Sequence, residues 1–466
     1  MISRLLLFGA TGDLAGRFLL PALARLSADG RVPDGLQVVG SAHQDWDDRT
    51  FRSHVATRLQ QHAGDVPIEA RDALISRLRY RAVDLEAAGS VAAAVGAFDD
   101  GGDAVDRPAV AVYLALPPVL FPAVLGALGG ADLPVGSRIA VEKPFGTDLT
   151  SAVALNELLT RVTGGVEEAA FRVDHFLGMP KVQALLDRHA PGRPLTPVWN
   201  SASIAQVDVL WEETLGLGGR ADFYDRTGAV RDVMQNHMLQ VLTLVAMEPP
   251  ARQTEGELHA AKLELLRSVR VCSAAEVPFR TRRARYAAGT LAEPGATGGR
   301  AVPGYSDEDG VDPARGTETY AELLLELDTP RWTGTRFVLR TGKALGTARK
   351  GVALHFRTAA PACDPGDAER VAADRLWIEL DAPLESRQPG VQVTAPGERA
   401  AYGQVLTDLL SGGSRLSVSG EEAEQAWRIV DPVLQAWARN AVPLLEYPAG
   451  GAGPPPLEQT AGSARG

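Results

Sequence analysis

The feature that most constrains the fold is a regular alternation of short apolar strands and helical segments over residues 1–175. Leu5–Phe8 and Val110–Leu116 are apolar runs of strand length, each followed by glycine or proline. Arg138–Glu142 and Phe171–Asp174 repeat the pattern further along the chain. Strands that alternate with helices predict a parallel, doubly wound sheet. We therefore expect the α/β fold class for the N-terminal part of the chain.

A different pattern begins after about residue 200. Ala202–Leu210, Tyr320–Leu327 and Arg336–Leu339 have the alternation of apolar side chains that is typical of strands. Two helices are predicted among them, at Asp232–Ala246 and Glu421–Leu434. Because strands outnumber helices, we expect an α+β domain built on a large, mostly antiparallel sheet.

The length of 466 residues favours two domains, because a single hydrophobic core rarely extends beyond about 250–300 residues. We place the first domain at residues 1–175 and the second at residues 176–447. Residues 286–318 are rich in Gly, Asp and Glu and are expected to form a surface loop. Residues 448–466 are rich in Gly, Pro and Ala, which predicts a disordered tail.

The charge and the cysteines exclude several classes of function. A net charge of −11 argues against nucleic acid and anionic membranes as partners. We find no apolar run of the roughly 20 residues that a membrane span requires. Cys272 and Cys363 have neither the spacing of a metal site nor that of a disulfide framework. We expect a cytoplasmic protein without a metal site.

A glycine-rich turn follows the first predicted strand. Its spacing is G-x-x-G-x-x-A, which differs from the usual G-x-G-x-x-G. A turn between a first strand and a first helix can hold a pyrophosphate on backbone N–H groups, so we predict a dinucleotide site rather than a plain tight turn. A Walker-type loop is excluded because no Gly-Lys-Ser/Thr follows. The predicted cofactor residues of the turn are Gly9, Ala10, Thr11, Gly12, Asp13 and Leu14.

The second predicted strand, Leu36–Gly40, decides which nicotinamide cofactor binds. An acid at its tip would favour NAD, and an arginine would bind the 2′-phosphate of NADP. The chain has neither in this position. His43 could meet the ribose or could be an ordinary loop residue, so the choice between NADP and NAD stays open.

Three further segments place charged groups at strand ends or on a helix: Glu142–Gly146, Arg172–Gly178 and Arg231–His237. Oxidation of an alcohol needs a base for the hydroxyl proton, and histidine suits that task near neutral pH. His237 is the candidate base, although a helical histidine with ordinary structural partners is the plainer interpretation of that residue alone. The carboxylate that would orient it is Asp174 or Asp232, and the residues alone do not choose between them.

Taken together and in this order, these segments resemble the glucose-6-phosphate dehydrogenase family over essentially the whole chain. The resemblance also includes segments outside the three just described. The segments that carry the resemblance are Gly9–Ala15, Tyr113–Pro118, Glu142–Gly146, Arg172–Gly178, Arg231–His237 with Met247-Glu248, Arg340–Leu345 and Ala426–Ile429.

The resemblance implies a Rossmann domain followed by a β+α domain, and assembly into a homodimer or homotetramer through the second domain. It implies oxidation of glucose 6-phosphate at C1 to 6-phosphoglucono-1,5-lactone with NADP or NAD, the first step of the oxidative pentose phosphate pathway. His237 would be the general base and Asp174 its orienting partner. The implied substrate contacts are His175 at the phosphate, Lys143 between substrate and nicotinamide, Glu213 and Asp232 at sugar hydroxyls, and Lys343.

The sequence departs from the family pattern in places that matter. Phe176 and Met179 stand where the family has tyrosine and a phosphate-binding lysine, and Lys181 could replace that lysine only if the chain before it is not yet helical. His43 stands where the family usually has the arginine for the 2′-phosphate. Phe121 replaces a tyrosine near the cofactor. Glu379 and Asp381 fit poorly with the second, structural NADP of some relatives, and we do not expect that site.

Three functions remain open from the sequence. The first is glucose-6-phosphate dehydrogenase activity with a relaxed choice of cofactor. The second is a specialised oxidoreductase for a different sugar phosphate, since the phosphate pocket is what has changed. The third is a catalytically weak homologue with a binding role, which the retained Lys143, Asp174 and His237 argue against.

Overall fold

A computed structural model of the chain forms two compact units, and each of them is described by itself below. The described residues are 1–85, 87, 89–98, 107–188, 193, 195–217, 219–252, 254–292, 299–358, 370–372, 374–380 and 396–457. Unit 1 comprises Met1–Gln183, Arg252–His259 and Gln388–Glu424, and unit 2 comprises Ala184–Ala251, Ala260–Arg387 and Gln425–Gly466. The division therefore differs from a single cut after residue 175, because a late segment of the chain returns to the first unit.

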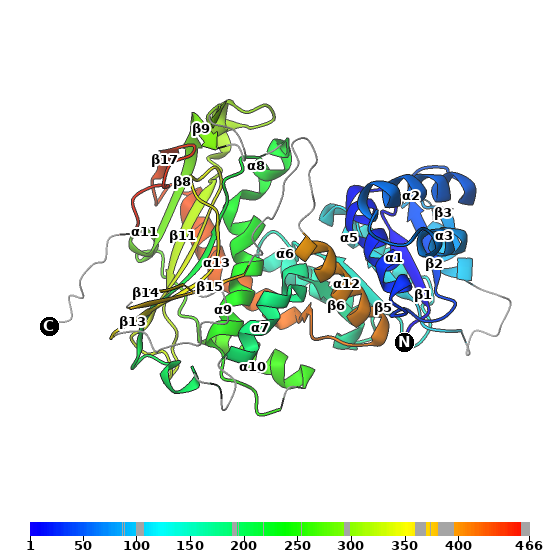
Figure 1. Cartoon of the computed structure of the whole chain (residues 1–466), viewed down its shortest axis with the longest axis horizontal. Helices are drawn as coiled ribbons and strands as arrows, with labels where there is room; N and C mark the ends of the chain where they lie inside the picture. Colours follow the sequence, from blue (N-terminus) through cyan, green and yellow to red (C-terminus); the bar gives the residue numbers. More distant parts are fainter. Residues whose placement is uncertain are drawn as a thin grey trace. The chain divides into compact units, whose positions relative to one another are not determined.

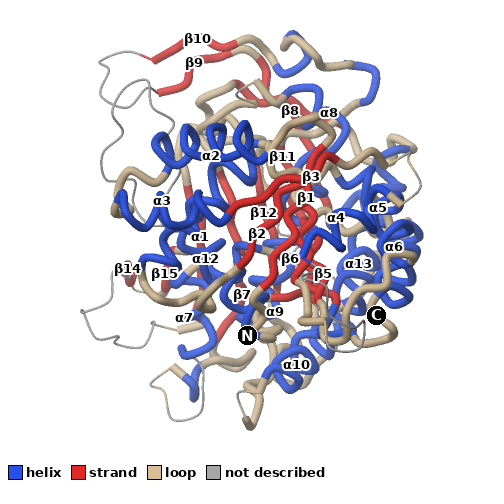
Figure 2. Tube along the Cα trace, turned by 90° about the vertical axis from the view of Figure 1, so that its right-hand side faces the viewer, coloured by secondary structure: helices blue, strands red, loops and turns tan. Residues whose placement is uncertain are grey.

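The sheet of unit 1 is the parallel, doubly wound sheet predicted from the strand–helix alternation. Every neighbouring pair of its strands is parallel except the pair at one edge, where Ser417–Val418 (β16) runs antiparallel to Ala170–Val173 (β6). Figure 2 shows β1, β2 and β3 side by side in this sheet. In spatial order its described strands are β16 (Ser417–Val418), β6 (Ala170–Val173), β5 (Arg138–Glu142), β4 (Ala111–Leu114), β1 (Arg4–Phe8), β2 (Gln37–Ala42) and β3 (Leu78–Ala82).

Helices follow the strands of this sheet, and side chains cap several of them. Asp47 accepts a hydrogen bond from the Thr50 N–H at the start of α2, and Asp148 and Ser151 form a capping box at the start of α6. The main helices are α1 (Leu20–Ala28), α2 (Asp48–His62), α3 (Ile68–Arg77), α4 (Ser90–Val95), α5 (Phe121–Gly129), α6 (Leu149–Val162) and α12 (Pro396–Ser411).

The buried Arg138 side chain on β5 anchors the C-terminal end of α12. Its guanidinium donates to the carbonyl oxygens of Asp408 and Leu409 at 3.0 Å each and of Gly413 at 2.7 Å. It also donates to the Glu168 carbonyl at 2.7 Å. The last carbonyls of a helix lack intrahelical donors and carry partial negative charge, so a cation there satisfies both needs. The late segment is thereby fixed to unit 1.

Replacing this side chain tests the anchor. Arg138→Met should lower the free energy of unfolding by about 2–5 kcal/mol, because it leaves several buried carbonyl groups without donors. Arg49→Met, at an exposed position of α2, is the matched control and should change stability by less than about 0.5 kcal/mol. Urea unfolding followed by circular dichroism measures both. Equal midpoints for the two variants would contradict the anchoring role.

The large sheet of unit 2 is mixed, so the prediction of a mostly antiparallel sheet was wrong. Ile204–Glu212 (β7) pairs in parallel with Arg336–Gly342 (β12), and Leu444–Pro448 (β17) pairs in parallel with Thr281–Ala287 (β8). Such pairs join segments far apart in the sequence, and apolar alternation carries no information about strand direction. In spatial order the described strands are β14 (Arg370–Ala372), β15 (Arg375–Glu379), β13 (Arg349–Phe356), β7 (Ile204–Glu212), β12 (Arg336–Gly342), β11 (Tyr320–Leu325), β8 (Thr281–Ala287) and β17 (Leu444–Pro448).

A run of helices, α8 (Ala221–Ala229), η8 (Val230–Met238) and α9 (Leu239–Ala246), lies along one face of this sheet (Figure 1). The predicted helix at Asp232–Ala246 falls in this run, but η8 is a π-helix with i→i+5 hydrogen bonding. Gly228 kinks the chain before η8 with a φ of 73°. A Cβ at Gly228 would lie 2.6 Å from the Glu318 carboxylate, which accepts a hydrogen bond from the Val230 N–H at 3.2 Å.

The remaining helices complete the described chain, and the predicted helix Glu421–Leu434 lies within α13. Among the described residues, no helix is long and apolar enough to cross a membrane. These helices are α7 (Pro180–Arg188), α10 (Glu255–Ser268), α11 (Val277–Arg280) and α13 (Gly420–Ala438).

Several expectations for loops and termini differ from the structure. Residues 286–318 are not only a loop, because β9 (Gly289–Ala292) and β10 (Gly299–Val302) form a hairpin there (Figure 2). The expected tail begins inside β17, and the Gly450 N–H donates to the Ala344 carbonyl at 2.8 Å. Residues 458–466 lie outside the described residues, as do Cys363 and Asp381, whereas Cys272 is buried.

Candidate functional site

The glycine turn after β1 is shaped by the neighbouring strand β4. Gly9 has a φ of 73°, and a Cβ on it would lie 2.1 Å from the Ala115 carbonyl oxygen. Only glycine tolerates both the left-handed backbone and this close approach. The Gly12 N–H donates to the Gly9 carbonyl at 2.9 Å, which closes the turn. Gly9 therefore lets the chain turn tightly where two parallel strands end.

A cavity of about 510 Å³ opens at the carboxyl ends of β1, β2 and β4. Of the predicted cofactor residues, Gly9, Thr11, Gly12 and His43 line it. The Thr11 hydroxyl donates to the Gln44 side chain at 3.0 Å and so joins the turn to the end of β2. Small residues and a concave site at this edge of a parallel sheet suit a dinucleotide.

The other predicted cofactor residues lie around the cavity rather than on its wall. Ala10 is fully buried under the turn, and Leu14 leads into the next helix. Asp13 forms ion pairs with Arg17 at 3.0 Å and with Arg58 at 2.9 Å. The acidic side chain therefore faces two arginines, which fits a role in holding the turn.

The charges that line this cavity bear on the choice of cofactor. Its described ionisable side chains are His43, after β2, and Asp84, after β3. A 2′-phosphate is usually bound by arginine, and neither of these side chains supplies that planar, permanent charge. The described residues that line the cavity therefore include no arginine for the 2′-phosphate. This is consistent with the expectation from His43 that NADP is not clearly favoured over NAD.

Lys143, Asp174 and His175 follow the ends of two adjacent parallel strands of unit 1, β5 and β6. Asp174 is fully buried, and its Oδ1 accepts a hydrogen bond from the Phe176 N–H at 3.1 Å. The imidazole of His175 stacks on the Tyr402 ring of α12 with centroids 4.9 Å apart and planes 13° apart. The structure therefore brings these three predicted residues to one edge of the sheet.

Glu142, the residue before Lys143, is a buried carboxyl in contact with two tyrosines. The Tyr113 hydroxyl donates to Glu142 Oε1 at 2.5 Å, and the Tyr402 hydroxyl also hydrogen-bonds to this carboxyl. Burial raises the pKa of Glu142 to about 7, although the two hydroxyls and the Lys143 ammonium favour the ionised form. A nearby carboxylate, Asp174, adds to the upward shift of the pKa.

This carboxyl should make stability depend on pH. Since its pKa in the folded state lies above the ordinary value of 4.5, its stabilising contribution is complete below about pH 4.5 and is lost as the pH rises through about 7. Glutamine does not titrate. The free energy of unfolding of Glu142→Gln, relative to the unmodified protein, should therefore rise by about 2–3 kcal/mol between pH 5 and 8.

Urea unfolding across that pH range measures the difference. Glu157→Gln, at an exposed position of α6, is the control and should follow the unmodified protein. A constant offset between Glu142→Gln and the unmodified protein at every pH would contradict the raised pKa.

The two departures from the family pattern at the end of β6 are both buried. Phe176 and Met179 are 3% and 6% exposed. Met179 has extended backbone angles, and its methyl group lies near Gly397 of α12. Met179 is not helical, but α7 begins at Pro180, so Lys181 is already the second residue of that helix and the condition for it to replace the family lysine is met only at Met179.

On unit 2, the predicted substrate residues Lys343, Glu213 and Asp232 form a charged cluster. Lys343 Nζ lies 2.6 Å from Glu213 Oε2 and 3.8 Å from Asp232 Oδ2. Lys350 Nζ lies 3.8 Å from the other oxygen of Glu213. Burial would raise the pKa of Glu213, but the two ammonium groups outweigh it and hold that pKa below its ordinary value.

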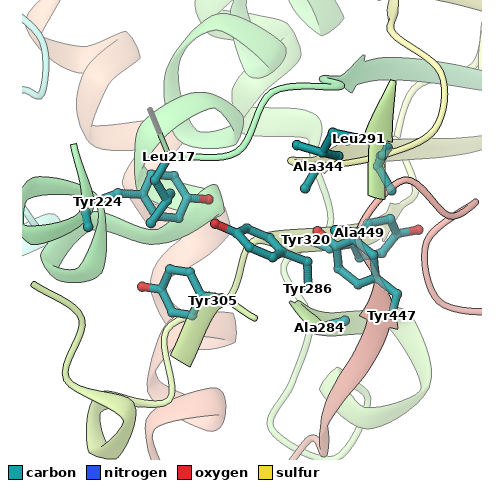
Figure 3. Packing of buried hydrophobic residues seen from close by; sticks show 12 residues of the cluster. Leu217, Tyr224, Ala284, Tyr286, Leu291, Tyr305, Tyr320, Ala344, Tyr447 and Ala449 are labelled. Carbon is teal, nitrogen blue, oxygen red and sulfur yellow. The ribbon is translucent and has the colours of Figure 1, made fainter. Parts of the chain in front are cut away.

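Aromatic side chains contact Lys343 of this cluster. Lys343 Nζ lies 5.1 Å from the centroid of the Tyr224 ring, a cation–π contact. The Tyr447 hydroxyl of β17 donates to the Lys343 carbonyl at 2.6 Å. Figure 3 shows Tyr224, Tyr286 and Tyr305 close together, from different elements of unit 2. The Lys343 backbone and ammonium group are thus both fixed by tyrosines.

The candidate base, His237, lies near the end of η8 and is 3% exposed. Its ring stacks on the indole of Trp211, with centroids 5.2 Å apart and planes 17° apart. In a π-helix the fifth residue along lies one turn further on, so Asp232 and His237 are neighbours on η8. The α-helical geometry assumed from the sequence would have separated them further.

Sequence reasoning missed Trp211, Tyr224 and Tyr402. Trp211 lies one residue beyond the predicted end of its strand, because β7 continues to Glu212. Tyr402 belongs to α12, which reaches its place through contacts that are remote in the sequence. Asp174 and His237 belong to different units, and their pairing stays a prediction.

Comparisons with known proteins cover both units. Residues 6–184 match the family model described as glucose-6-phosphate dehydrogenase, NAD binding domain. Residues 193–465 match the C-terminal domain of the same family. The chain belongs to the glucose-6-phosphate dehydrogenase family.

Individual members of the family match the chain over nearly its full length. Glucose-6-phosphate 1-dehydrogenase of Mycolicibacterium smegmatis is 35% identical, and the alignment covers 96% of this chain and 93% of the relative. The enzyme of that name from Zymomonas mobilis is 31% identical, with 97% and 96% covered.

Solved glucose-6-phosphate dehydrogenase structures have the same fold. One, in complex with its substrate glucose 6-phosphate, is 27% identical with a TM-score of 0.80, covering 97% of this chain and 95% of that one. The crystal structure from Mycobacterium avium is 30% identical with a TM-score of 0.76, covering 97% and 96%.

Proposed function

We propose that the protein is a glucose-6-phosphate 1-dehydrogenase that oxidises C1 of the sugar to the 6-phosphoglucono-1,5-lactone. The observation that carries the proposal is the partly buried cluster of Lys343, Glu213 and Asp232 on unit 2, beside a stacked histidine, in a chain of this family. Two carboxylates and an ammonium group suit a ligand with many hydroxyl groups, because they offer several acceptors and a donor at fixed positions.

In this proposal, His237 removes the proton from the C1 hydroxyl as C1 loses its hydrogen as hydride and becomes the lactone carbonyl. Asp174 orients the imidazole and stabilises the cation that forms, a role that family membership supports. Lys143 and His175 bind the substrate, His175 at the phosphate. Glu213 and Asp232 hold sugar hydroxyls, and Lys343 keeps the local charge balanced.

The cavity at the glycine turn is the proposed site of NADP or NAD, which when bound supplies the hydride acceptor. Gly9, Thr11 and Gly12 would hold the pyrophosphate, and His43 would meet the adenosine ribose. Ala10, Asp13 and Leu14 would shape the turn, and Lys143 would reach the nicotinamide end. We further propose a cytoplasmic homodimer or homotetramer.

The function is tested by absorbance of the reduced cofactor with purified protein, NAD or NADP, and millimolar glucose 6-phosphate. Turnover with at least one cofactor is expected, and glucose without the phosphate should be a much poorer substrate. Turnover only with another sugar phosphate would favour the specialised oxidoreductase, because the changed phosphate site at Phe176 and Met179 would then have a new ligand. No turnover with any of them would overturn the proposal.

The base is tested by His237→Asn. Asparagine cannot take the C1 hydroxyl proton, so kcat should fall by about 10²–10⁴ while KM for glucose 6-phosphate changes little. Steady-state kinetics at saturating cofactor measure both constants. Near-normal kcat in this variant would remove His237 from the role of base.

Cofactor choice is tested by His43→Arg. A new arginine contact to the 2′-phosphate is worth about 1.5–3 kcal/mol, so the ratio of kcat/KM for NADP over NAD should rise roughly tenfold to a hundredfold. His43→Gln adds no charge and should leave that ratio near its original value. An unchanged ratio in His43→Arg would mean that the 2′-phosphate lies elsewhere.

A further inference from the structure

A tryptophan that the proposed function does not use contacts the proposed base. Trp211 lies near the end of β7 and is 9% exposed. Its indole is nearly coplanar with the His237 imidazole, 17° apart, at a centroid distance of 5.2 Å. Stacking between aromatic rings restricts rotation of both, so the indole limits the directions in which the imidazole nitrogens can point.

The same indole also carries a cation. Lys350 on β13 is directly opposite Trp211 in the antiparallel pair with β7. Its Nζ lies 4.8 Å from the indole centroid, and the same ammonium group lies 3.8 Å from Glu213. The Lys350 ammonium group therefore lies near both the Glu213 carboxylate, which is proposed to bind the substrate, and the indole that stacks on the base. Lys350 is one of only five lysines in a chain that otherwise uses arginine.

These contacts act in opposite directions on the charge of His237. The face of an indole is electron-rich and attracts a cation, so stacking favours the imidazolium that forms when the base takes its proton. An ammonium group on the same indole repels that imidazolium. A base for alcohol oxidation must be neutral at first and then accept a proton, so it needs both influences in balance.

Resting on the proposed function, we propose that Trp211 is a positioning residue for the His237 base, and that Lys350 keeps that base neutral by opposing the indole. Other charged groups on the packed elements share the surroundings of His237 and set its absolute titration midpoint. They are Arg231 and Asp232 on η8, Glu213 after β7, Lys343 after β12, and Asp174 through its proposed pairing.

The test follows His237 itself rather than turnover. The intact protein, labelled with ¹⁵N and ¹³C in histidine, is titrated by NMR, and His237→Asn assigns the signal. In Trp211→Leu the midpoint should fall by about half a pH unit or more, because the imidazolium loses its contact with the indole. Trp211→Phe keeps an aromatic face and should stay closer to the original midpoint.

Substitution of Lys350 should shift the His237 midpoint in the opposite direction, and a second substitution at this position serves as the control. In Lys350→Met the midpoint should rise, because an ammonium group near the imidazolium is gone, whereas Lys350→Arg keeps the charge and should change it little. An unchanged or raised midpoint in Trp211→Leu would overturn the role of the indole. If Trp211→Leu does not fold, the Trp211→Phe and Lys350 variants still test the proposal. Equal midpoints in Lys350→Met and Lys350→Arg would overturn the role of the ammonium group.

Kinetics then separate positioning from general stability. Trp211→Leu should lower kcat by about five- to tenfold with KM changed less than about threefold, because only the orientation of the base is lost. Trp377→Leu changes a half-buried tryptophan on β15 of the same sheet and should leave kcat near its original value. Equal losses in both variants would mean that the effect is structural. Absence of turnover in the unmodified protein would overturn the proposed function, while the NMR titration would still decide this inference.

Discussion

The charged cluster of unit 2, the proposed substrate site, depends on the ion pair between Lys343 and Glu213. Removing an ion from water costs several kcal/mol, so neither group is stable in this place alone. The parallel pairing of β7 with β12 brings them together: Glu212 is opposite Gly342, and the Glu213 N–H donates to the Gly342 carbonyl at 2.9 Å. The next residue after each strand then supplies one partner of the pair. The parallel direction of β7 and β12 therefore places Glu213 next to Lys343.

Much of the N-terminal unit could be predicted from the sequence because its signals are local. Gly9 follows an apolar strand directly, and the order of strands and helices determines a parallel sheet. The second unit was harder, since the pairing of β8 with β17 joins residues 281–287 to residues 444–448, far apart in the sequence. Trp211 and Tyr402 were missed for the same reason: each acquires its role from a residue on another element. The π-helical winding at His237 also leaves no periodic signal that differs clearly from an α-helix.

The changed motif after β6 has a physical counterpart in the packing. A phenylalanine and a methionine are buried where the family pattern has a tyrosine and a lysine, and Met179 lies against Gly397 of α12. The same helix presents Tyr402 to the ring of His175 and to the carboxyl of Glu142. Met179 is extended, whereas Pro180 and Lys181 are the first two residues of α7. The proposed phosphate end of the site therefore depends on a few retained groups and on α12, which Arg138 anchors.

Every role proposed above depends on transfer of hydride from C1 of glucose 6-phosphate to a nicotinamide. Incubation with glucose 6-phosphate deuterated at C1, followed by mass spectrometry of the reduced cofactor, tests it most directly. We expect one deuterium in each reduced nicotinamide and slower turnover than with the unlabelled sugar. Reduced cofactor without deuterium, or no reduced cofactor at all, would contradict it.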